Sequence, residues 1–176
     1  NRAALQQLLD RGAKVRYFDH HAAGNPPVHP LLELHLNFDH RCCSSLLMDA
    51  HLKGEFRNWA LVGAYGDNLS DVADALPARL DAHDRTRLRE FGEALNYNAY
   101  GEDEGDVRIH PALRYETLIR YRDPRELLAT EKISSDLIEA RRADLHQAAG
   151  QAPFWQSEHA SVTLLPDAPW SRRVIG

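Results

Sequence analysis

The residues best suited to chemistry are three consecutive polar side chains, Asp19-His20-His21, and a later carboxylate, Asp67. Imidazole and carboxylate groups together suit Mn²⁺, Zn²⁺ or Fe²⁺, and a carboxylate-rich set favours Mn²⁺. Because successive side chains at a strand end point in different directions, one histidine can bind a metal while the other faces a substrate. Asp19 can then orient a histidine through the ring nitrogen that does not bind metal.

These residues also fit two ordinary structural roles. Asp19 fits a capping aspartate followed by two solvent-facing histidines, and Gly66-Asp67-Asn68 fits a common turn. The sequence around these residues is therefore needed to decide between a metal site and ordinary capping and turn roles.

Two apolar segments are expected to position these side chains. Residues 13–18 alternate in polarity, which predicts a strand that ends at Asp19, and residues 59–65 are nearly all apolar, which predicts a buried helix or strand before Asp67. An amphipathic helix pattern over residues 1–12 ends at Gly12, so helix, glycine and strand form the second half of a βαβ unit. We expect an α/β fold with a mainly parallel sheet flanked by helices. Open sheets of this kind place their chemistry at the carboxyl ends of strands.

The remaining pattern predicts a helix-rich chain with two further strands. The ranges are a strand over 31–38, helices over 42–52, 70–81, 84–97 and 111–121, a long charged helix over 126–150, and a strand over 161–165. The final residues, Val174-Ile175-Gly176, also suggest a strand.

Composition excludes several classes of protein. The 176 residues include 21 basic and 26 acidic side chains, a net charge of −5, which argues against a protein that coats nucleic acid through a broad basic face. No apolar run approaches the roughly 20 residues of a membrane span. The two cysteines, Cys42 and Cys43, are adjacent, so we expect no disulfide framework, small apolar packing roles and a cytoplasmic protein.

The segment Val15-Arg16-Tyr17-Phe18-Asp19-His20-His21-Ala22-Ala23-Gly24 resembles the signature motif of the DHH phosphoesterase superfamily. Residues 59–68 resemble the fourth motif of that superfamily, an apolar segment that ends in a ligand aspartate. Residues 42–47 are similar to the helix start between those motifs, and Asn96-Tyr97-Asn98-Ala99-Tyr100-Gly101 is loosely similar to an Asn-Ala-x-Gly stretch of the exonuclease branch.

The resemblance implies a two-metal phosphohydrolase, usually dependent on Mn²⁺, with Mg²⁺ as an alternative. By position, His20 and Asp67 are metal ligands, His21 contacts the scissile phosphate or leaving oxygen, Asp19 orients a histidine, and Asn98 contacts substrate. The expected reaction is hydrolysis of phosphodiester bonds in short oligonucleotides or single-stranded nucleic acid. Two cations hold a bridging hydroxide and neutralise charge as it attacks phosphorus. Inorganic polyphosphate or pyrophosphate and cyclic dinucleotides are alternative substrates, and a degenerate nucleotide- or partner-binding module without turnover is the alternative of another class.

The resemblance also implies a domain plan. Residues 1–125 correspond to the C-terminal part of the DHH domain, 126–150 to a connector helix, and 151–176 to the start of a smaller substrate-binding domain. The superfamily's first motif, His-x-Asp-x-Asp, and its second motif precede the Asp-His-His motif and are absent here. We therefore expect a fragment that is inactive by itself and holds no tightly bound metal pair.

Overall fold

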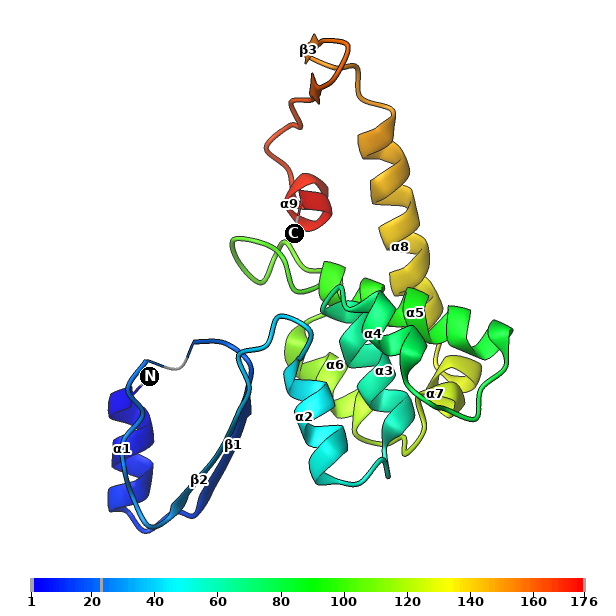
Figure 1. Cartoon of the computed structure of the whole chain (residues 1–176). Coiled ribbons are helices and arrows are strands. Elements are labelled where there is room, and N and C mark those ends of the chain that lie inside the picture. Colours follow the sequence, from blue (N-terminus) through cyan, green and yellow to red (C-terminus); the bar gives the residue numbers. More distant parts are fainter. Residues whose placement is uncertain (1, 23, 176) are drawn as a thin grey trace.

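The structure, a computed structural model, describes residues 2–22 and 24–175 (Figure 1). Over this part of the chain it is a mixed α/β protein that is 51% helical and contains a small two-stranded parallel sheet. Three residues lie outside the described part of the chain. They are Asn1 of the predicted first helix, Ala23 of the Asp-His-His segment and Gly176 of the predicted final strand. No helix in 2–22 or 24–175 is long and apolar enough to cross a membrane.

The N-terminal unit is a helix followed by two parallel strands. Its elements are α1 (Arg2–Asp10), β1 (Val15–Asp19) and β2 (Leu32–Leu36), with β1 and β2 paired in parallel from Val15↔Leu32 to Asp19↔Leu36. Gly12 follows α1 at φ +83°, and its N–H donates to the carbonyl of Leu9 at 2.9 Å, so it terminates the helix as predicted. In Figure 1 the strand pair lies between α1 and α2, which places the end of β1 against the helical part of the molecule.

The central body consists of helices packed around one apolar core. Its elements are α2 (Ser44–His51), α3 (Arg57–Gly66), α4 (Ser70–Ala75), α5 (Ala82–Tyr97), α6 (Pro111–Leu118) and α7 (Pro124–Thr130). The predicted helix-or-strand at 59–65 is therefore a helix, α3, and the predicted helix over 70–81 ends at Ala75. Fully buried side chains of α3, α5 and α7 form the core, including Leu61, Tyr65, Leu88, Phe91 and Leu127.

The predicted long helix over 126–150 is wrong, because the chain forms two helices there. Helix α7 ends and α8 (Lys132–Ala149) begins at Glu131, whose backbone is extended at φ −100° and ψ 118°. The Glu131 carbonyl accepts from Ser134 Oγ at 2.7 Å, and its carboxylate accepts from Tyr121 Oη at 2.6 Å. These bonds hold the break between α7 and α8.

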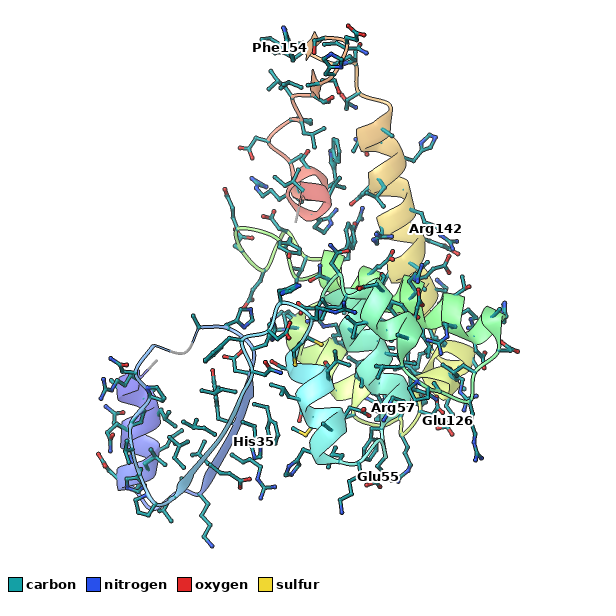
Figure 2. The ribbon with its side chains drawn as sticks, in the orientation of Figure 1. His35, Glu55, Arg57, Glu126, Arg142 and Phe154 are labelled. Carbon is teal, nitrogen blue, oxygen red and sulfur yellow. The ribbon has the colours of Figure 1, made fainter. Side chains whose placement is uncertain are left out.

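Beyond α8 the chain forms a short hairpin and a last helix. Strands β3 (Trp155–Gln156) and β4 (Ser161–Val162) pair antiparallel, so only two residues of the predicted strand over 161–165 are strand. Phe154, labelled in Figure 2, directly precedes β3, and its side chain is exposed. The predicted final strand is also wrong, since Val174 and Ile175 belong to α9 (Pro169–Ile175), which packs on α8.

Candidate metal centre

The structure brings together His20 and Asp67, the two predicted metal ligands. His20 follows the last residue of β1, and Asp67 is the C-cap residue of α3. The Nε2 atom of His20 lies 3.3 Å from Oδ2 of Asp67, and their side chains are 19% and 42% exposed. Both residues line the same hollow, so the prediction that they converge on one cleft is confirmed.

Ser44, the first residue of α2, holds the other nitrogen of the His20 ring. The backbone N–H of Ser44 lies 3.1 Å from Nδ1 of His20, and the Ser44 hydroxyl oxygen lies at the same distance. A backbone N–H can only donate, so Nδ1 accepts it and the proton of the neutral ring is assigned to Nε2, facing Asp67. Because the hydroxyl can also accept, Nδ1 finds a partner in either tautomer.

Three glycines place the end of α3 beside α2 and α5. A Cβ atom on Gly63 would lie 2.0 Å from Ser45 Oγ, one on Gly66 would lie 2.8 Å from the carbonyl oxygen of Gly92, and one on Gly92 would lie 2.3 Å from the carbonyl oxygen of Val62. Helices with side chains at these positions could not approach as closely. The glycines therefore fix the position of Asp67 relative to the start of α2, where Ser44 holds His20.

Asp19 orients His21 and not His20. Its Oδ1 atom accepts from His21 Nδ1 at 2.9 Å and from the backbone N–H groups of His20 at 2.8 Å and His21 at 3.1 Å. Its Oδ2 atom accepts from Tyr17 Oη at 2.7 Å. The Tyr17 bond first, and then those of His21, hold the pKa of Asp19 well below its usual range. Asp19 is therefore an ionised acceptor that fixes the His21 ring and leaves its Nε2 atom free of this contact.

The donor set fits a divalent cation. One ligand atom each from Asp19, His20 and His21 falls within a group whose members all lie within 4.8 Å of one another, and Asp67 is not a member of this group. Two donors on one ion, each at about 2.1 Å from it, lie roughly 3.0 to 3.4 Å apart. The 3.3 Å between His20 Nε2 and Asp67 Oδ2 meets this condition. Imidazole with carboxylate is a donor set for a transition-metal ion such as Mn²⁺.

A hollow of about 360 Å³ opens beside the two ligands. Its walls come from the start of α2, the end of α3, α5 and α6. Among the lining residues are Ser45, Gly63, Gly92, Asn96 and Arg114. A second hollow, toward α8 and α9, shares Gly66, Asp67 and Asn96 with the first. Asp67 therefore stands where two depressions meet.

Asn98, the predicted substrate contact, is fully buried and does not line either hollow. Its Oδ1 atom accepts from the N–H groups of Arg108 at 2.8 Å and Ile109 at 3.1 Å, and its Nδ2 atom donates to the Ile109 carbonyl at 2.8 Å. These backbone contacts give both ends of the amide a partner and brace the loop before α6. We therefore correct the assignment and treat Asn98 as a residue that positions this loop.

Cys42 and Cys43 do not contribute a nucleophile to the site. Cys43 is buried, and burial raises the pKa of both thiols, so neither is poised as a thiolate. The partial burial of Cys42 and the burial of Cys43 agree with the predicted role of both side chains as small apolar packing groups.

Sequence reasoning missed two residues of the site, Ser44 and Arg114. Ser44 was recognised only as a helix start, although its contact with His20 depends on how β1 approaches α2. Arg114 lies in α6, and no spacing rule links that helix to the Asp-His-His motif.

The chain was compared with family models, curated proteins and solved structures. It matches no family model, no curated protein and no solved structure.

Proposed function

We propose that this chain carries part of the catalytic site of a metal-dependent phosphoesterase of the DHH type. One observation carries the proposal: the ring nitrogen of His20 and the carboxylate of Asp67 face each other at 3.3 Å from two different elements. Convergence of an imidazole and a carboxylate from distant segments, at ligand spacing and beside a hollow, supports metal binding over two unrelated turns.

In this proposal each residue of the site has a distinct task. His20 and Asp67 hold a divalent cation, Mn²⁺ or Mg²⁺, and the Ser44 hydroxyl accepts from Nδ1–H of His20 when Nε2 is the ligand atom. When bound, such a cation supplies Lewis-acid stabilisation of phosphate charge and lowers the pKa of water. Asp19 holds the Nδ1–H of His21, so Nε2 of His21 is directed to contact the phosphate or to hold a proton for the leaving oxygen.

The proposal includes parts of the superfamily plan that the described residues do not contain. These are a second cation, the ligands of the first and second motifs, and a wider, mainly parallel sheet of which β1 and β2 are one pair. The proposed substrates are short oligonucleotides or single-stranded nucleic acid. This preference is supported by the resemblance of residues 96–101 and of the chain as a whole to the superfamily, and buried Asn98 has no part in it.

The experiment measures hydrolysis of bis(p-nitrophenyl) phosphate with Mn²⁺ by the natural protein that contains this chain. His20→Asn and Asp67→Asn are expected to lower kcat/KM at least a hundredfold, while His35→Asn, on β2 outside the hollow, leaves it within twofold. A panel of dinucleotides, cyclic dinucleotides and polyphosphate then ranks the substrates. Unchanged rates in both site variants would contradict the metal assignment. Mn²⁺ binding with no turnover of any substrate would favour the non-catalytic binding module.

A further inference from the structure

Arg114 is a half-buried arginine that faces the candidate metal centre without an acidic partner. Its Nη1 atom donates to the carbonyl of Leu95 at 3.0 Å. Among the described residues, no carboxylate oxygen lies within the 4.0 Å of an ion pair with its guanidinium. A guanidinium has five N–H donors, so most of its donors are unused by the protein.

Arg173 and Arg57 are buried or partly buried arginines that carboxylates neutralise, whereas Arg85 and Arg87, like Arg114, donate to backbone carbonyls. Arg173 pairs with Asp144 at 2.7 Å, and Arg57 pairs with Asp49 at 2.7 Å. Burial without such a partner lowers the pKa of Arg114. The position therefore bears a desolvation penalty that an incoming anion would relieve.

Arg114 lines two neighbouring cavities. Apolar side chains of α5, α6 and α8, including Phe91, Leu95 and Leu118, surround a narrow apolar slot that Arg114 also lines. Arg114 also lines the hollow that contains His20 and Asp67. Arg114 therefore borders both cavities, and a long side chain in such a place can bury its stem while its charged head stays accessible.

Glycines of α3 and α5 also line the hollow. Gly63, Gly66 and Gly92 line it, and they present backbone rather than side chains on that surface. No ion pair joins Arg114 to Asp67, so the metal ligands and the guanidinium stand at separate positions of one cavity. Guanidinium groups bind phosphate oxygens through paired, charge-assisted hydrogen bonds.

We propose that Arg114 is the phosphate-binding residue of this hollow and holds a phosphate group of the substrate beside His20 and Asp67. The proposal deepens the proposed function, on which it rests, by requiring a substrate with an accessible phosphate at this position. Arg114 contributes binding and orientation, and no proton transfer is assigned to it.

The test is a titration of the metal-free chain with inorganic phosphate, followed by the ¹H–¹⁵N signal of the Arg114 Nε–H group and by calorimetry. The Arg114 signal is expected to shift to saturation. Arg114→Gln is expected to weaken phosphate binding about tenfold or more, because the charge-assisted bonds are lost, and Arg114→Lys less, because the charge remains. The control is Arg87→Gln, at an arginine of α5 that donates to the Leu128 carbonyl at 2.7 Å and does not line the hollow, and it should bind phosphate as the parent does.

The outcomes separate this inference from the proposed function. Phosphate affinity that is equal in the parent and Arg114→Gln, with both proteins folded by circular dichroism, would overturn the role of Arg114. Broadening of the His20 signals by Mn²⁺ in Arg114→Gln, as in the parent, shows that the metal assignment stands by itself. If Mn²⁺ does not broaden the His20 signals of the parent while phosphate still binds at Arg114, the result counts against the proposed function and not against the phosphate site.

Discussion

Arg173 in α9 donates to Asp144 in α8 at 2.7 Å, and both side chains are about 4% exposed. Tyr97 at the end of α5 donates to the same carboxylate and accepts from Arg173 Nε at 2.9 Å. Arg108 reaches the other carboxylate oxygen at 3.0 Å. The last helix is thus attached to α5 and α8 by a buried polar network. Tyr97 and Arg173 of this network line the second hollow, which Asp67 also lines.

Arg173→Ala is expected to destabilise the protein by about 1.5–3 kcal/mol, because it removes a charge-assisted hydrogen bond from buried Asp144 and leaves Arg108 and Tyr97 as its remaining partners. Urea unfolding followed by circular dichroism measures the change. The control is Arg142→Ala on the outer side of α8 (Figure 2), whose pair with Glu90 is exposed. Its expected effect is below about 1 kcal/mol. Equal effects of the two variants would show that the buried network does not hold α9.

Tyr17→Phe is expected to raise the pKa of Asp19 toward its ordinary value of about 3.9, since it removes the hydrogen bond that lowers this pKa most. A carboxylate whose pKa is lowered by folding stabilises the fold above its unfolded-state pKa, and this contribution is lost as pH falls through the folded-state pKa. In Tyr17→Phe the loss therefore begins at higher pH. A titration of the Asp19 carboxyl carbon by NMR measures it, with Tyr115→Phe, at an exposed position of α6, as the control. The same Asp19 pKa in both variants would exclude the Tyr17 bond as the cause.

The two neighbouring histidines are expected to have opposite neutral tautomers. His20 accepts the Ser44 N–H at Nδ1 and so carries its proton on Nε2, whereas His21 donates from Nδ1 to the ionised Asp19. Long-range ¹H–¹⁵N correlation spectra of the metal-free protein at a pH where both rings are neutral distinguish the two forms. Identical tautomers would mean that Ser44 or Asp19 does not hold its ring as described.

Gly92→Ala is expected to destabilise the protein by about 1–3 kcal/mol or more, because the new methyl group meets the Val62 carbonyl on the backbone of α3. Thermal unfolding measures this effect. The shift of α3 should also move Asp67 away from His20 and weaken Mn²⁺ binding. Gly150→Ala, where a Cβ atom meets only ordinary contacts at 3.5 Å and 3.6 Å, is the control with a small expected effect. Parent-like stability of Gly92→Ala would show that α3 and α5 tolerate a wider spacing.

Local signals predicted the parts of the fold that local chemistry determines. Gly12 ends α1 because its backbone adopts positive φ, and the strand predicted over residues 13–18 corresponds to β1, Val15–Asp19. The break at Glu131 was not predictable, since helical character continues on both sides and the break is held by Tyr121, a tertiary partner. Val174 and Ile175 have strand-forming side chains, yet the Arg173 network holds that segment on α8 as a helix.

The candidate site divides in the same way. The motif residues identified His20 and Asp67, and the pairing of Asp19 with a histidine was expected. Which histidine it holds depends on the direction of the chain after β1, so the sequence did not distinguish His21 from His20. Asn98 was assigned from a pattern of residue types. Such a pattern cannot show that the Asn98 side-chain amide forms hydrogen bonds with the backbone of Arg108 and Ile109.

The most direct test of the account is whether one cation binds His20 and Asp67 together. Mn²⁺ is added at substoichiometric amounts, and its paramagnetic broadening of the histidine ring signals is recorded by NMR. The account predicts broadening of His20 and of the adjacent His21 ring, with His51 much less affected, and at least a tenfold higher Mn²⁺ concentration for the same effect in Asp67→Asn. Broadening that is uniform over the histidines, or that is unchanged in Asp67→Asn, would contradict it.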